Sequence, residues 1–197
     1  TPYWTKNSYF GQIDTAGFPK DSYYICQSEW LDPEVKPMIH IFPYWDYNDG
    51  QIIDVRVCSN LSCIELFFND ESYGRKYIDH INGDSLCVNY QLPYSKGTIK
   101  AIAYDENNNA VVTDTISSFE DTYSFNLSEN NINIVEGDTR LRCIEVQAID
   151  INGLNVRNAT DRVIVSVNGP GEIVGIDNGN STDYESYKSN VKKLFNG

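Results

Sequence analysis

The strongest constraint on the fold is an alternation of apolar and polar residues with a period of two, which begins at Met38. Within residues 52–57, aliphatic residues alternate with Asp54 and Arg56, so an extended chain would have one buried and one solvated face. Segments of strand length recur at intervals of roughly ten residues, which is typical of an antiparallel β-sandwich. They are expected at 38–43, 51–59, 62–69, 72–78, 85–92, 97–105 and 110–117.

Two groups of polar residues between these strands are typical of hairpin turns. Asn69, Asp70 and Glu71 separate the third and fourth expected strands, and residues 106–109 separate the sixth and seventh. Asn and Asp tolerate the backbone conformations that tight turns need. We therefore predict β-hairpins at both points.

A polar stretch at 119–122 is followed by a second set of strand-like segments. Between Cys143 and Ile144 the apolar phase slips by one residue, which predicts a β-bulge. Thr182 and Glu185 have the spacing of a capping box, which predicts a short helix. The strands of this second sandwich are expected at 123–128, 132–135, 139–149, 154–157, 161–168 and 172–176.

The first 36 residues lack this alternation and are rich in aromatic side chains. Pro19 and Asp21 suit the first turn of a helix, and Pro33 forbids its continuation, so we expect one helix at 19–30. Residues 9–14 look like a short strand that ends in an Asp-containing turn. The predicted fold class is therefore all-β, with parts at 1–36, 37–118 and 119–197.

Charge and hydropathy exclude two classes of partner. Lysine and arginine number 15 against 28 aspartates and glutamates, giving a net charge of −13, and no basic run offers a phosphate contact. We expect no nucleic-acid partner. No apolar run approaches the roughly 20 residues of a membrane helix, so we expect no membrane partner either. The chain opens at Thr1 without a leader, which favours a piece of a longer protein.

The metal-binding and redox residues form no familiar site. The five cysteines are an odd set without CxxC spacing, so we expect no disulfide framework and no zinc, and unpaired thiols weakly favour a cytoplasmic location. Residues 105–116 begin like a calcium loop but have Ala110 and Ile116 where the loop needs Gly and Glu. The oxygen-rich loop at 177–183 is interpreted as a turn in preference to a cation site. No metal and no cofactor are predicted.

Catalytic motifs are also missing. There is no nucleophile motif of the G-x-S-x-G type, and His40 and His80 are the only histidines, so a triad has few possible bases. His40 alternates with isoleucines, which favours a hydrogen-bonded structural role. The remaining signal is aromatic: Tyr3, Trp4, Tyr44, Trp45 and Tyr47 lie in loop-like sequence where they could stack on sugars, although buried packing is favoured for most of them.

Three stretches together carry a family resemblance. Residues 9–24 with 27–30 resemble the last strand and last helix of the catalytic barrel in bacterial β-galactosidases of glycoside hydrolase family 2. The segment HIFPYWDY at 40–47, with 50–55, resembles the opening of the sandwich that follows that barrel. Residues 163–197 are similar to the terminal immunoglobulin-like domain of the same enzymes. The matches occur in the family's order and span nearly the whole chain.

The resemblance implies two immunoglobulin-like sandwiches after a remnant of a (β/α)8 barrel. It places the catalytic glutamates before Thr1, so no catalytic residue is expected here, and residues 1–36 should pack on the first sandwich or be poorly ordered. Trp4, in the loop before the last barrel strand, is the candidate substrate-binding residue, with interdomain packing as the alternative. The implied partners are the rest of the enzyme with its catalytic barrel, its carbohydrate substrate and other copies in a homo-oligomer.

Two other functional classes stay open at this point. A carbohydrate-binding module would use exposed aromatic side chains for recognition, and saturable sugar binding would distinguish it. A cell-surface adhesion module would need an export or anchoring signal, which this sequence does not show.

Overall fold

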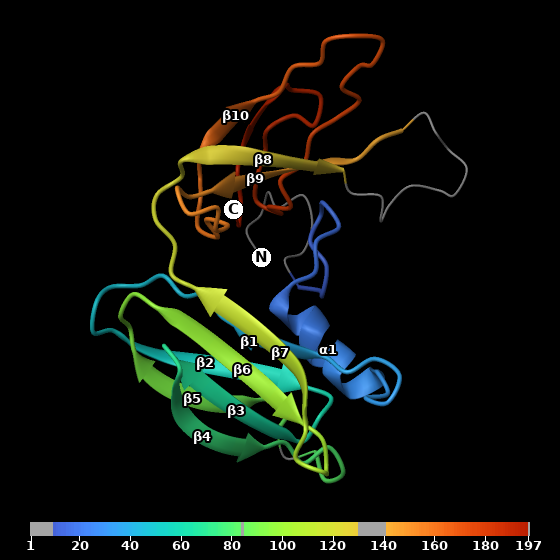
Figure 1. Ribbon diagram of the computed structural model, residues 1–197. Helices are drawn as coiled ribbons and strands as arrows, with labels where there is room; N and C mark the ends of the chain where they lie inside the picture. Colours follow the sequence, from blue (N-terminus) through green and yellow to red (C-terminus); the bar gives the residue numbers. More distant parts are fainter. Residues whose placement is uncertain (1–9, 84, 130–140, 197) are drawn as a thin grey trace. The chain divides into compact units, whose positions relative to one another are not determined.

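The computed structural model describes residues 10–83, 85–129 and 141–196. Its strands are antiparallel and the described part contains a single helix, so the all-β prediction is confirmed (Figure 1). The chain forms two compact units. The first unit is Pro19–Ser118, and the second unit joins Phe119–Gly197 to Thr1–Phe18. The boundary at Phe18 thus divides the segment 1–36 that the sequence suggested as one part.

The first unit is a sandwich of two sheets. One sheet has the order β1-β2-β5 and the other has the order β4-β3-β6-β7. All seven strands predicted between residues 38 and 117 are confirmed, with ends shifted by at most a few residues. The strands are β1 (Ile39–Phe42), β2 (Ile52–Ser59), β3 (Cys63–Phe68), β4 (Glu71–Tyr77), β5 (Val88–Pro93), β6 (Thr98–Tyr104) and β7 (Ala110–Ser117).

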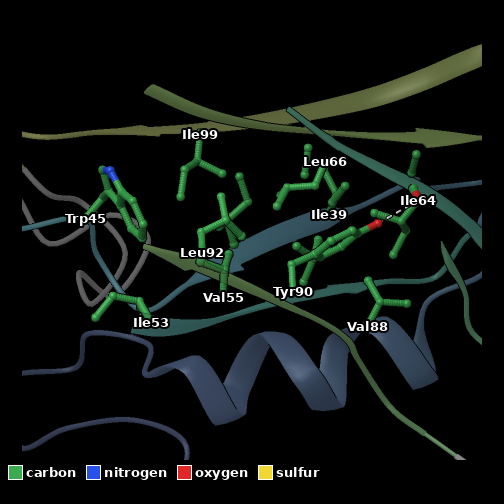
Figure 2. Packing of buried hydrophobic residues seen from close by; sticks show 14 of the residues in the cluster. Ile39, Trp45, Ile53, Val55, Ile64, Leu66, Val88, Tyr90, Leu92 and Ile99 are labelled. Atoms are coloured by element: carbon green, nitrogen blue, oxygen red, sulfur yellow. Dashed lines mark hydrogen bonds between the residues drawn. The ribbon is translucent and has the colours of Figure 1, made fainter. Parts of the chain in front are cut away.

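The core lies between these sheets and follows from the alternation. In β6, and in β2 as far as Val57, every second side chain is buried, and the inward residues of both sheets meet in one apolar cluster (Figure 2). Tyr90 of β5 crosses this core, with its hydroxyl 3.2 Å from the carbonyl oxygen of Ile64 and 3.1 Å from that of Gly74. A polar tip that finds carbonyl acceptors can be buried at little cost, and burial raises the pKa of this phenol.

Both predicted hairpins are present. Asn69 and Asp70 have φ angles of 47° and 67° between β3 and β4, which matches a tight turn. Between β6 and β7, Asn108 has φ 66°, and the Asp105 carboxylate accepts from the backbone and side-chain nitrogens of Asn109. These bonds lower the pKa of Asp105. The segment that resembled a calcium loop is therefore a hairpin turn.

Helix α1 (Asp21–Trp30) matches the helix predicted at 19–30. It contacts β1 and β2, and its Ser28 side chain is buried. The Asn60 amide anchors the following segment, since it donates to the carbonyls of Leu31 and Lys36 and accepts from the Met38 amide. The helical part of residues 1–36 therefore folds onto the first sandwich.

The predicted strand at 9–14 is wrong for the described residues 10–14, which contain one isolated bridge residue, Ile13. The predicted Asp-containing turn is confirmed: the Asp14 carboxylate accepts from the amides of Ala16 and Phe18, both at 2.9 Å. Local side-chain bonds of this kind compete with strand pairing.

The second unit contains two short two-stranded sheets. β8 (Ser124–Glu129) pairs with β9 (Ile144–Ile149), and β10 (Arg162–Ile164) pairs with β11 (Val191–Lys193). The strands predicted at 123–128, 139–149 and 161–168 are confirmed in part, whereas 132–135 lies outside the described residues. Residues 172–176 form no strand, 154–157 contributes a single bridge at Asn155, and the strand at 191–193 was not predicted.

Two local predictions in the second unit are wrong. β9 begins at Ile144, so the slip in apolar phase marks the start of a strand and not a bulge. No helix begins at Thr182, because its hydroxyl donates to the side-chain oxygen of Asn180 at 2.8 Å and does not accept from a helical amide. The Glu185 amide instead donates to the Asp183 carboxylate, and the segment forms successive turns.

Candidate functional site

The aromatic–acidic patch of the first unit comprises Asp21, His40, Tyr44, Asp46 and Tyr47. Asp21 is the first residue of α1, His40 lies in β1, and the other three lie in the loop after β1. The peptide bond that joins Phe42, the last residue of β1, to Pro43 is cis. The patch therefore forms where the start of the helix meets the end of a strand.

Tyr44 and Tyr47 form the aromatic part of the patch. Their ring centroids are 5.6 Å apart and the planes differ by 3°, and 38% of Tyr44 is exposed. Tyr47 also meets Trp45 and Tyr94 edge to face, at 6.4 Å and 6.1 Å. Contact with buried rings holds Tyr47 in place, so the pair is a fixed surface and not two independent side chains.

His40 links three elements of the first unit. Its Nε2 lies 3.1 Å from Asp21 Oδ1 of α1, its Nδ1 lies 3.9 Å from Asp114 Oδ2 of β7, and Tyr24 stacks on the ring at 3.9 Å. The Asp114 carboxylate also accepts from the Ile41 amide at 2.8 Å. The hydrogen-bonded structural role predicted for His40 is therefore confirmed.

The groups around Tyr47 determine which hydrogen bonds the patch can donate and accept. Burial raises the pKa of Tyr47, and the nearby Tyr44, Asp21 and Asp46 raise it further. The phenol therefore stays protonated at neutral pH and can donate a hydrogen bond, while the carboxylates accept. Flat rings beside hydroxyl and carboxylate groups suit contacts to the apolar faces and hydroxyl groups of sugars.

Four carboxyl groups have electrostatics opposite to those of a glycosidase acid. Such an acid needs a raised pKa so that it stays protonated near neutral pH. The carboxyl pKa values that are shifted in the described residues, those of Glu65, Asp79, Asp105 and Asp150, are all lowered. In Glu65 the largest cause is a hydrogen bond from Ser72, and in Asp150 it is a bond from the Glu120 amide.

The second unit contains a shallow pocket of about 160 Å³, which is smaller than most ligand pockets. Several of its polar lining groups are engaged in local bonds: the Asn178 amide donates to the Lys193 carbonyl, and Asp183 accepts from Lys192 at 3.1 Å. The loop 177–183 thus forms turns, in agreement with the interpretation from sequence. The lining residues are Thr160, Asn178, Asn180, Asp183, Glu185, Lys193, Leu194 and Phe195.

Within the described ranges, no three His, Cys, Asp or Glu side chains lie close enough together to hold a metal ion. No helix in the described part of the chain is long and apolar enough to span a membrane.

The structure separates the aromatic residues that the sequence grouped together. Trp4, the predicted substrate-binding residue, and Tyr3 lie outside the described residues. Trp45 is fully buried and donates from Nε1 to the Ser95 carbonyl at 3.0 Å, so it is a core residue and not a sugar contact. The approach of Asp21 to Tyr47 was missed, because nothing in the local pattern indicates that α1 starts beside this loop.

The chain matches two protein-family models and several known proteins in sequence. Residues 126–197 match glycoside hydrolase family 2 C-terminal domain 5, and residues 50–112 match a domain of unknown function. The chain is 37% identical over its whole length to β-galactosidase BoGH2A of Bacteroides ovatus, and 29% identical over 95% of its length to a putative β-glucuronidase of Formosa agariphila. It spans 23% and 18% of these relatives.

A crystal structure of a β-glycosidase from Bacteroides vulgatus matches 98% of the chain with a TM-score of 0.86 and 33% identity, and the chain covers 24% of that protein. Sequence and fold thus agree over nearly all of the chain, and they match a small part of larger enzymes. The chain belongs to glycoside hydrolase family 2, as a C-terminal region of its enzymes.

Proposed function

We propose that this chain is the non-catalytic C-terminal part of an enzyme that hydrolyses terminal β-galactosides. Its two units act there as immunoglobulin-like sandwiches that support the catalytic barrel, shape access to the sugar pocket and contribute to oligomer contacts. The observation that carries the proposal is the 37% identity to a β-galactosidase over the whole chain. The identity to the putative β-glucuronidase is lower, at 29%.

The electrostatics support a non-catalytic role. Ionised carboxylates that accept from backbone amides, such as Asp105 and Asp150, stabilise turns and are poor proton donors at neutral pH. The reactive acids of the intact enzyme would then lie on barrel strands that precede Thr1.

The test compares two proteins, the 197-residue chain and a longer protein that carries the proposed barrel before Thr1. Each is assayed with a chromogenic β-galactoside and a chromogenic β-glucuronide. We expect no turnover by the chain alone, and preferential cleavage of the galactoside by the longer protein. Turnover by the chain that is lost when one of its own acids is replaced would contradict the non-catalytic role. A preference of the longer protein for the glucuronide would contradict the substrate.

The roles proposed for Trp4 and for the oligomer contacts can be measured separately. In the longer protein, Trp4→Ala should weaken galactoside binding if Trp4 forms a wall of the pocket, and sedimentation should reveal an oligomer that depends on residues 37–197. The cytoplasmic location predicted from the thiols is tested by cell fractionation.

A carbohydrate-binding module is the second candidate, and the parallel Tyr44 and Tyr47 rings favour it. Trp45 lies beside Tyr47, so sugar bound at the patch should change tryptophan fluorescence. Titration of the chain with galactosides and galactose-containing polysaccharides should saturate, and Tyr44→Ala should abolish the change. Tyr73→Ala is the matched control, since Tyr73 lies in β4 of the same unit and is similarly exposed (40%). A flat titration would reject this candidate.

A further inference from the structure

The pairing of β2 with β5 brings Cys58 and Cys87 together, although the whole β3–β4 hairpin lies between them in sequence. The antiparallel register ends with Val57 opposite Val88, and continuing it by one residue, just beyond the start of β5, would place Cys58 opposite Cys87. Directly opposed residues have Cα atoms about 4.5–5.5 Å apart and side chains on the same face. This separation lies within the range of about 4.4–6.8 Å that a disulfide spans.

The two thiols are in contact on the outer face of the sheet. Their side chains share a hydrogen bond, and the Ser28 side chain of α1 lies near Cys58. Cys58 is fully buried, whereas Cys87 is partly exposed. Cys87 is therefore the more exposed residue of the pair, and Cys58 lies on the side of β2 that α1 contacts.

The surroundings shift the pKa values of the two thiols in opposite directions. The hydrogen bond from Cys58 lowers the pKa of Cys87 and Arg56 lowers it further, against the opposing effects of burial and of Glu29. The same hydrogen bond and burial raise the pKa of Cys58. Because the thiolate is the nucleophile in disulfide exchange, Cys87 is the sulfur that reacts first.

The other described cysteines do not have a cysteine opposite them in a sheet. Cys63 of β3 lies opposite Tyr77 on one side and Tyr104 on the other, and it shares a hydrogen bond with Tyr77. Cys26 lies in helix α1, and Cys143 belongs to the second unit. The cross-strand arrangement is therefore specific to Cys58 and Cys87.

We propose that Cys58 and Cys87 form a reversible disulfide by exchange with a low-molecular-weight disulfide. The Cys87 thiolate attacks the oxidant, which breaks its S–S bond, forms a mixed disulfide on Cys87 and releases one thiolate. Cys58 then loses its proton and attacks the Cys87 sulfur, which releases the second thiolate. Two protein thiols are oxidised, the oxidant is reduced to two thiols, and the two protons pass to solvent or to the released thiolates.

The cross-link would close a ring around the β3–β4 hairpin of the first unit. A covalent link restricts the unfolded chain more than the folded one, so oxidation stabilises this unit. We expect the melting temperature of the first unit to rise on the order of 10 °C.

The experiment incubates the 197-residue chain with increasing oxidised glutathione, alkylates the remaining thiols under denaturing conditions and maps tryptic peptides by mass spectrometry. We expect the thiol count to fall from five to three. Residues 57–75 and 77–96 should appear as one cross-linked peptide pair that dithiothreitol separates. Because this readout uses the unaltered protein, it does not depend on whether a variant folds.

Cys63 shares the 57–75 peptide with Cys58, so the Cys63→Ser variant is the matched control. The cross-linked pair should persist in Cys63→Ser and disappear in Cys58→Ser, which should instead carry glutathione on Cys87. Five thiols that survive excess oxidised glutathione would overturn the proposal. So would a cross-link that Cys63→Ser abolishes and Cys58→Ser retains.

Discussion

The two units of this chain achieve order by different means. In the first unit, sixteen buried hydrophobic side chains from both sheets form one cluster. In the described part of the second unit, the corresponding cluster has four, Phe119, Ala148, Val156 and Ala159. The second unit buries charged groups instead, since Asp150 and Lys192 are each 2% exposed.

The difference shows how local composition decides the source of stability. Alternating aliphatic residues let the first unit bury apolar area between sheets, which is the largest favourable contribution to folding. The second unit is rich in Asn, Asp and Ser, whose side chains bond to nearby backbone groups and form turns, and in Gly, which tolerates turn conformations. Its order therefore depends on a few directional contacts, and single polar substitutions should matter more there.

The substitution with the largest expected effect tests the apolar core of the first unit. Trp45→Ala removes a fully buried side chain and its bond to the Ser95 carbonyl, so it should destabilise the first unit by about 3–5 kcal/mol. Urea unfolding followed by circular dichroism measures the loss. Trp30→Ala is the control, since that side chain is 76% exposed, and a similar loss in both variants would argue against a core role.

The substitution with the next largest expected effect tests a buried charge in the second unit. Lys192 donates to Asp183 Oδ2 at 3.1 Å and to the Glu185 carbonyl at 3.2 Å. Lys192→Ala leaves the Asp183 carboxylate without this partner and should destabilise the second unit by about 3 kcal/mol. Hydrogen exchange should increase in peptides from 141–196 and stay unchanged in 39–117. Lys193→Ala is the neighbouring control, and uniform loosening of both units would contradict the comparison.

A pH titration tests the polar loop around Asp150. Its carboxylate accepts from the amides of Glu120, Asn152 and Leu154, and these bonds lower its pKa. A lowered folded-state pKa contributes stability above the unfolded value of about 3.9, and this contribution is lost as the pH falls through the folded value.

Asp150→Asn should therefore lower the melting temperature of the second unit by a few degrees at pH 7. The deficit should shrink as the pH drops below about 4. A deficit that is constant between pH 7 and pH 3 would mean that the charge of Asp150 is not responsible.

The final substitution tests a close approach within the second unit. Gly179 has φ +75°, and a Cβ there would lie 2.1 Å from Asp14 Oδ2. Gly179→Ala should cost about 1–3 kcal/mol, from the conformation and the displaced carboxylate. Gly153→Ala is matched in φ (+81°) but meets no atom within 4 Å, so it should cost about 1 kcal/mol. Equal losses would show that the contact with Asp14 contributes nothing.

Part of the candidate site could be predicted from the sequence, and part of it could not. The sequence pointed to the aromatic loop after β1 and to a structural His40, because both signals are local. It did not separate the buried Trp45 from the stacked Tyr44 and Tyr47, since burial of a loop aromatic depends on contacts with Tyr94 and Phe68 from distant strands. The substrate-binding role of Trp4 stays a prediction.

Sequence alone determined the all-β class, the seven strands of the first unit, helix α1 and the hairpin turns, because side-chain alternation and turn chemistry act between neighbouring residues. Tertiary structure alone decided which strands pair and in what register. That register brought Cys58 close to Cys87, and chain packing set Asp21 beside His40. In the second unit, residues 172–176 form no strand and the Ile176 amide donates to the Tyr187 carbonyl, whereas pairing with the distant β10 created β11, because a strand needs a neighbouring chain for its backbone hydrogen bonds.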